Sequence, residues 1–175
     1  MKFEQKWTGY SVTDGKYSDG FSVTVPGNIQ RDYAAYMGWG DVNYMDNCRK
    51  FLDIEDLFWS YKTEIEYTKN EGERVFFVTH GIEYEYDIIL NGKKLVHHEG
   101  MFTKVELDIT DELESGSALE VLIYPHPKRE GAVEDRALPI SPASLRLSTA
   151  GTGIRGCFCR VCGMKPTLKP EPCPT

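Results

Sequence analysis

The segment between residues 38 and 58 combines the kinds of side chain that bind sugars. Carboxylates and amides hydrogen-bond to hydroxyl groups, and aromatic rings pack on the apolar faces of sugar rings. A long loop with weak periodicity in a small domain is usually functional. Trp39 and Tyr44 could equally anchor this loop to a hydrophobic core. Our candidate sugar-binding residues are Asp41, Asn43, Tyr44, Asp46 and Asn47.

Residues that could perform catalysis are harder to find. Glu83 and Glu85 would lie about 7 Å apart on one face of a strand, close to the separation of the two carboxylates of a glycosidase. Neighbouring acids on a strand are more commonly a solvated face. The sequence contains no Gly-x-Ser-x-Gly, P-loop or Gly-x-Gly-x-x-Gly motif. We therefore assign no catalytic residue and expect no cofactor.

Four of the five cysteines lie near the C-terminus, where Cys159 and Cys162 form a C-x-x-C pair. A structural zinc site needs four ligands, and Cys157 and Cys173 are the remaining candidates. Prolines flank Cys173, and no histidine follows Pro127. We expect no metal site, and a small zinc-binding interaction protein remains an alternative that rests on this segment alone.

Charge and hydropathy narrow the classes of partner. The 175 residues include 20 Lys and Arg against 27 Asp and Glu, a net charge of -7, so we expect no nucleic-acid partner. No apolar run approaches the ~18 residues of a membrane span, and the start has no apolar signal region. We therefore expect a cytoplasmic protein without a membrane partner, in which thiols stay reduced.

The elements that must position the candidate residues are mainly strands. An alternating apolar pattern from Trp59 onward, interrupted by short turns, predicts an all-β sandwich. Asn91-Gly92 predicts a type I′ hairpin, because both central residues of that turn need positive φ. The helical exception is Ile29–Met37, with Asn28 as its cap and Ile29, Tyr33, Tyr36 and Met37 on one face. The expected strands are Tyr61–Tyr67, Arg74–Thr79, Tyr86–Leu90, Lys94–His97, Phe102–Ile109 and Ala118–Tyr124.

Several motifs occur in a characteristic order: Val25-Pro26-Gly27-Asn28, Gly38 to Asn47 ahead of Leu57-Phe58-Trp59-Ser60-Tyr61, His80-Gly81-Ile82-Glu83, Ile88-Ile89-Leu90-Asn91-Gly92, and Gly100-Met101-Phe102 before Asp108-Ile109-Thr110. This order resembles the N-terminal sugar-binding domain of glycoside hydrolase family 2, especially its β-mannosidase-like members. The sequence departs from the family at Glu83, where Asp is usual, and at Asn47-Cys48, where many members have Asn-Glu.

The resemblance implies a jelly-roll β-sandwich of the galactose-binding type. In that family the catalytic glutamates belong to a later (β/α)₈ barrel, and loops of this first domain contact the sugar. We therefore expect a carbohydrate-contacting domain that lacks its catalytic barrel and is inactive alone. Its expected partners are carbohydrate and the missing barrel. A free-standing carbohydrate-binding module is the alternative, since it would need no barrel.

The segment after Ser144 has a different composition, with five Arg and Lys against one Glu, so it carries +4 and the rest carries -11. Members of the family continue here with a segment like Y-G-W-D-W-H-P-R, which this sequence lacks. If the third base of each codon from Ser148 onward is joined to the first two bases of the next codon, the genetic code permits that segment. We therefore expect a sugar-binding domain over residues 1–140, incomplete at its end, and an irregular tail over 141–175, read out of frame after a slip between Arg136 and Ser148.

Overall fold

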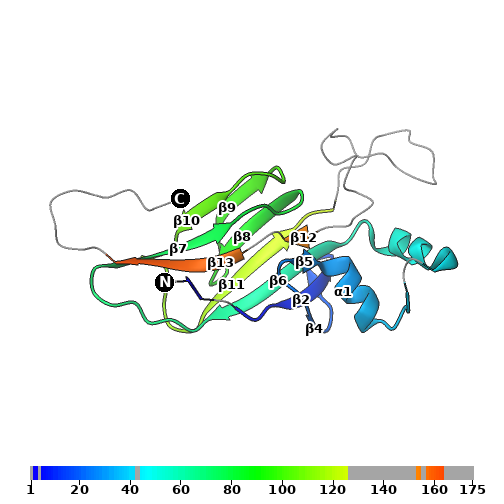
Figure 1. The fold of residues 1–175 in the computed structure, drawn as a ribbon, viewed down its shortest axis with the longest axis horizontal. Coiled ribbons are helices and arrows are strands. Elements are labelled where there is room, and N and C mark those ends of the chain that lie inside the picture. The colour runs from blue at the N-terminus through cyan, green and yellow to red at the C-terminus, as the bar shows by residue number, and fades with distance from the viewer. Residues whose placement is uncertain (1, 4, 42–43, 126–152, 155–156, 164–175) are drawn as a thin grey trace.

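The computed structural model describes residues 2–3, 5–41, 44–125, 153–154 and 157–163. They form a β-sandwich of two antiparallel sheets, as the alternating pattern predicted (Figure 1). The larger sheet has the order β3-β2-β6-β11-β8-β9, with β4 beside β2, and the smaller has the order β1-β13-β7-β10. A short ladder joins β12 to β5. The larger sheet contains β2 (Thr8–Thr13), β3 (Lys16–Tyr17), β4 (Phe21–Ser22), β6 (Phe58–Ile65), β8 (Glu85–Leu90), β9 (Lys93–Glu99) and β11 (Ser117–Ile123).

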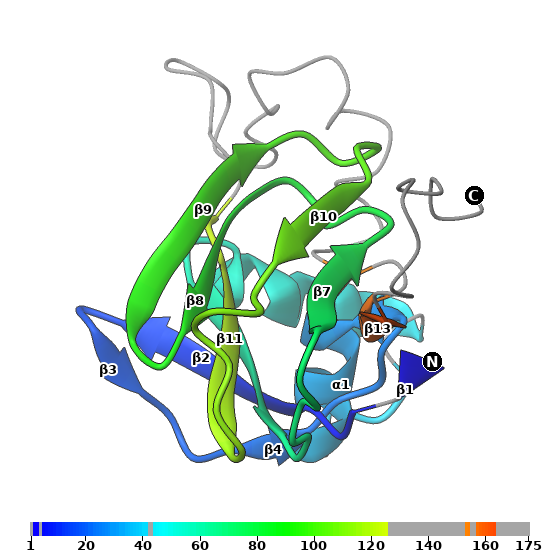
Figure 2. The same ribbon diagram turned by 90° about the vertical axis from the view of Figure 1, so that its left-hand side faces the viewer.

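The smaller sheet contains β1 (Lys2–Phe3), β7 (Glu73–Thr79), β10 (Val105–Asp108) and β13 (Cys157–Gly163). Figure 2 shows β7 and β10 facing β8, β9 and β11 across the core. The remaining elements are β5 (Gly27–Asn28), β12 (Gly153–Ile154), the helix α1 (Ile29–Tyr36) and the 3₁₀ helix η1 (Met45–Ile54). Among the described residues, no helix is long and apolar enough to cross a bilayer.

Aromatic rings connect the two layers. The Trp7 ring lies 6.4 Å from the Tyr61 ring of the larger sheet and 6.5 Å from the Phe77 ring of the smaller one. Side chains of β6 and β11 that alternate toward the interior complete the core, including Ile65, Leu119, Val121 and Ile123. Each buried side chain of this size contributes about 1.5–3 kcal/mol relative to an exposed one. The period-two alternation of these strands therefore directs every second side chain into the core.

The hairpin between β8 and β9 is confirmed. Asn91 and Gly92 have φ values of 51° and 78°, as a type I′ turn requires. The Asn91 side chain accepts a hydrogen bond from the Ala118 backbone N–H at 2.9 Å and donates one to Ser117 Oγ at 3.1 Å. Asn91 thus also ties the hairpin turn to the start of β11.

Helix α1 begins where the sequence predicted, but its buried face differs. Asn28 caps the helix, because its side chain accepts a hydrogen bond from the Arg31 backbone N–H at 3.1 Å. Ile29 is buried, whereas Tyr36 and Met37 are about half exposed. The helix ends at Tyr36, so Met37 falls outside it; the Tyr36 ring stacks on buried Phe21 at 5.5 Å, and Ala34 is buried as well.

Two other expectations need correction. The strand expected from Phe102 begins only at Val105, and Phe102 is exposed. The tail expected to be irregular over 141–175 contains β12 and β13, and β13 pairs with β7 from Cys157↔Thr79 to Gly163↔Glu73. The N-terminal strands were not predicted, because most of them are only two residues long and too short to show a period.

Candidate functional site

The predicted sugar-binding loop lies between α1 and β6, at one end of the sandwich (Figure 1). Trp39 anchors it: its ring packs edge-on against Tyr33 at 6.0 Å and against Phe51 of η1 at 5.5 Å. The Lys50 ammonium lies 5.9 Å from the centroid of the Trp39 ring. Of the two roles considered for Trp39, the structure therefore shows the anchoring one.

The next residues close a tight turn on the Asp41 carbonyl. That oxygen accepts hydrogen bonds from the Tyr44 backbone N–H at 3.1 Å and from Asn47 Nδ2 at 2.9 Å. The Asn47 backbone N–H in turn donates to the Tyr44 carbonyl at 3.2 Å. The Asn47 amide is half-buried and holds the loop in shape.

Tyr44 is 64% exposed, so most of its ring lies outside the core. Asp41 is also exposed. Tyr44 and Asp41 thus present a ring and a carboxylate on a turn that Asn47 stabilises. Two other candidates cannot be compared with the prediction: Asn43 and the side chain of Asp46 lie outside the described residues.

A second polar cluster, which the sequence did not predict, lies on the outer face of the larger sheet. Asp87 is only 4% exposed, and its carboxylate accepts hydrogen bonds from three partners. His97 Nδ1 lies 2.7 Å from Asp87 Oδ1, while Lys94 Nζ and Tyr124 Oη lie 2.8 Å and 2.9 Å from Oδ2. His97 Nε2 is 3.6 Å from Glu85 Oε1.

This cluster changes the titration of its members. Burial alone raises the pKa of the Asp87 carboxyl, but hydrogen bonds from Lys94, His97 and Tyr124 outweigh it and hold the pKa below its usual value. The same bond to Asp87 raises the pKa of Lys94. Burial, together with Asp87, raises the pKa of Tyr124. At neutral pH the cluster therefore contains an ionised Asp87 and a charged Lys94.

Another carboxylate on the same face, Glu120 of the neighbouring strand β11, is also held by several groups. Glu120 Oε1 accepts hydrogen bonds from Ser60 Oγ at 2.6 Å and Tyr17 Oη at 2.8 Å, and Glu120 Oε2 lies 3.4 Å from Lys62 Nζ. Lys62 Nζ also sits 3.6 Å from the Tyr17 ring centroid. Burial, followed by the bond to Glu120, raises the pKa of Tyr17 to about 12.

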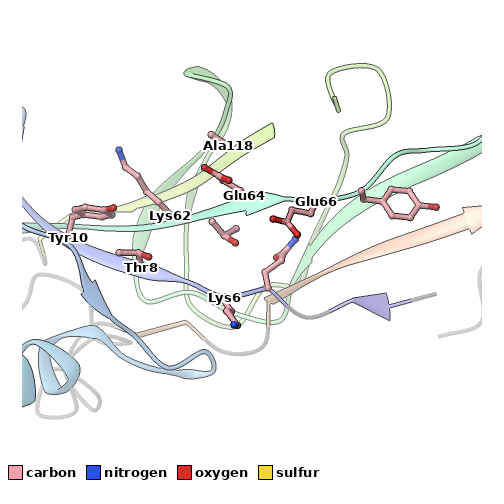
Figure 3. A pocket seen from close by; sticks show the side chains of 10 residues that line it. Lys6, Thr8, Tyr10, Lys62, Glu64, Glu66 and Ala118 are labelled. Carbon is pink, nitrogen blue, oxygen red and sulfur yellow. The ribbon is translucent and has the colours of Figure 1, made fainter. Parts of the chain in front are cut away.

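A groove of about 800 Å³ crosses the same outer face toward the C-terminal end of β6 (Figure 3). Side chains of β2, β6 and the start of β11 line it, together with residues that flank these strands. Its lining mixes carboxylates, amines, an amide and phenol rings: Gln5, Lys6, Thr8, Tyr10, Lys62, Thr63, Glu64, Glu66, Tyr67 and Ala118.

Glu83 and Glu85, the two acids considered as a glycosidase-like pair, do not lie together on one solvated strand face. Glu83 precedes β8 and is buried, whereas Glu85 opens β8, is partly exposed and faces His97. Among the residues that the structure describes, no group of three or more His, Cys, Asp or Glu side chains could hold a metal ion.

Two packed antiparallel sheets with a loop-bearing end define this protein as a β-sandwich domain of the galactose-binding type. Residues 7–155 match the family described as glycosyl hydrolase 2 galactose-binding domain-like, and the chain belongs to that family.

Known proteins resemble the chain over most of its length. It is 30% identical to mannosylglycoprotein endo-beta-mannosidase of Lilium longiflorum over 139 residues, which is 71% of this chain and 14% of the lily protein. The fold matches that of β-D-mannosidase from Dictyoglomus thermophilum with a TM-score of 0.69 at 22% identity, covering 93% of this chain and 22% of that one. Amycolatopsis orientalis exo-chitosanase gives a TM-score of 0.63 at 18% identity, covering 89% and 20%. The chain therefore spans about a fifth or less of these enzymes.

Proposed function

We propose that this chain is the carbohydrate-contacting N-terminal domain of a glycoside hydrolase whose catalytic residues lie in a separate barrel. The observation that carries the proposal is the family match over residues 7–155, combined with the small share of each related enzyme that the chain spans. On this proposal the chain does not hydrolyse glycosides alone.

The residue that would contact the sugar most directly is Tyr44. Its ring is exposed on a turn that hydrogen bonds from Asn47 and the Tyr44 backbone hold in place. An exposed, preorganised aromatic ring can pack on the apolar face of a sugar without much loss of side-chain entropy. Asp41, next to it, would accept hydrogen bonds from sugar hydroxyls. The barrel would supply the opposite wall of the site.

The test is to sequence the coding DNA around and beyond codon 175, restore the reading frame where a slip is found, and express the domain together with the catalytic domain encoded there. We expect the extended protein to hydrolyse a β-mannoside or a related β-glycoside, and the 175-residue chain to show no hydrolysis. Tyr44→Ala in the extended protein should lower kcat/KM about tenfold through loss of stacking. Hydrolysis that is unchanged by Tyr44→Ala would contradict the assignment of this loop.

A free-standing carbohydrate-binding module is the second candidate, because Tyr44 is exposed in the chain as it stands. Such a module would bind sugar through Tyr44 without any barrel. Calorimetric titration of the 175-residue chain and its Tyr44→Ala variant distinguishes the two candidates.

A further inference from the structure

The groove on the outer face of β2, β6 and β11 is separate in sequence from the Tyr44 loop. Its volume of about 800 Å³ falls within the range of roughly 300–1,000 Å³ that is typical of small-molecule sites. In Figure 3, Tyr10 and Thr8 lie toward one end and Glu66 toward the other, with Glu64 and Lys62 between them.

Several charged groups of the groove are free to bind a ligand. Within the residues that the structure describes, the side chains of Lys6, Glu64 and Glu66 have no hydrogen-bond or ion-pair partner. Glu120, on the same outer face, is different because Ser60, Tyr17 and Lys62 already occupy its oxygens. The groove therefore offers unused donors and acceptors beside groups that are committed to the fold.

The Tyr10 ring is held in place at the end of the groove. The Tyr17 ring packs edge-on against it at 6.0 Å, and Lys62 Nζ lies 5.5 Å from its centroid. Gly20 lies directly behind it, since a Cβ atom at Gly20 would come within 3.0 Å of Tyr10 Cε1 and 2.9 Å of Thr8 Cγ2. Lys62 lies closer to Tyr17, at 3.6 Å from its ring centroid, and Tyr10 rather than Tyr17 lines the groove at this end.

The charges of the groove favour an uncharged ligand. Both signs of charge line it: Lys6 and Lys62 are cationic and Glu64 and Glu66 are anionic, and Lys62 also pairs with Glu120 at 3.4 Å. A polyanionic chain would meet two free carboxylates, and a polycation would meet two amines. Many hydroxyl groups, by contrast, can donate to the carboxylates and accept from the amines at once.

We propose that this groove binds a neutral oligosaccharide, with Glu64, Glu66 and Lys6 hydrogen-bonding its hydroxyls and Tyr10 packing on a sugar ring. The inference rests on the carbohydrate-contacting function proposed above, but it uses a different surface. The Tyr44 loop needs the barrel to complete its site, whereas the groove residues named here all belong to this chain.

The experiment is calorimetric titration of the 175-residue chain with mannotetraose and cellotetraose, and with tetragalacturonate as the anionic counterpart. We expect saturable binding of at least one neutral tetrasaccharide and no binding of the anionic one. Glu64→Gln and Glu66→Gln should each weaken that binding about tenfold, because each removes a charge-assisted hydrogen bond. Glu71→Gln, an exposed glutamate in a turn outside the groove, is the matched control and should leave binding unchanged.

Tyr44→Ala separates this inference from the proposed function. Binding that survives Tyr44→Ala and is lost in the groove variants supports the groove. Binding that is lost in Tyr44→Ala and unaffected by Glu64→Gln and Glu66→Gln overturns it and favours the free-standing module. Absence of binding to both neutral tetrasaccharides also overturns the groove, while the activity of the extended protein still decides the proposed function. Circular dichroism of each variant confirms that it is folded.

Discussion

The Asp87 carboxylate accepts a hydrogen bond from His97 Nδ1 at 2.7 Å, and the two residues face each other directly across the β8–β9 ladder. Asp87 is nearly buried although its side chain is on the outer face of the sheet, because Lys94, His97 and Tyr124 fold over it. The outer face of the larger sheet is thus a network organised around two carboxylates, Asp87 and Glu120.

Asp87→Asn should destabilise the protein by about 3 kcal/mol at pH 7. The substitution removes a buried charge that three donors share and turns an acceptor into a donor. Because the pKa of Asp87 is lowered in the folded state, its stabilising effect is present above the unfolded pKa of about 3.9 and is lost as the pH falls through the lower folded value. Urea unfolding of both proteins between pH 3 and pH 7 measures this. A difference in stability that does not shrink toward acid pH would contradict the role of the Asp87 charge.

Tyr17 should lose its proton only near pH 12 in the folded protein. Its raised pKa means that the stabilising bond to Glu120 is fully present below the unfolded pKa of about 10 and is lost as the pH rises through 12. The pKa values of Tyr61, Tyr67 and Tyr124 are also raised, so ultraviolet absorbance titration should show several late-titrating phenols, and one fewer in Tyr17→Phe. Tyr44→Phe is the matched control because it removes an exposed hydroxyl, and it should leave the number of late-titrating phenols unchanged.

Gly92→Ala should destabilise the protein by about 1–2 kcal/mol, since Gly92 has a φ of 78° that costs a side-chain-bearing residue this much. A Cβ atom there would meet nothing within 4 Å, so the cost comes from the backbone alone. Thermal denaturation measures the change. Lys93→Ala at the next, exposed residue is the control, and an equal loss in both variants would contradict the backbone explanation.

The reading frame of the C-terminal segment is a further prediction. We propose that one inserted or deleted base lies between the codons of Arg136 and Ser148. The shifted frame permits the Tyr-Gly-Trp-Asp-Trp segment of the family. A Trp codon in that frame needs a next residue whose codon begins with GG, and Gly stands at each of these positions. Sequencing the coding DNA should show that restoring the frame yields Trp-Asp-Trp. Any other peptide in the restored frame would refute the slip. Stoichiometric zinc in the purified protein that is lost in Cys159→Ser would support the zinc-binding alternative instead.

The candidate site could be predicted only in part from the sequence. Trp39 and Tyr44 were recognised as the aromatic residues of the loop, but their division of roles depends on contacts with α1 and η1: Trp39 packs inward on Tyr33 and Phe51, and Tyr44 stays exposed. The groove was not predicted, because Lys6 and Tyr10 reach it from strands and flanks too short or irregular to show a pattern.

Local chemistry determined the features that the sequence predicted by itself. Positive φ at Asn91 and Gly92, the Asn28 cap and the period-two alternation of β6 and β11 each depend on neighbouring residues in the chain. The contacts that organise the outer face join residues far apart, such as Tyr17 with Glu120 and Asp87 with Tyr124. Only the tertiary structure decided these, because the pairing and register of distant strands depend on packing across the whole sandwich rather than on local propensity.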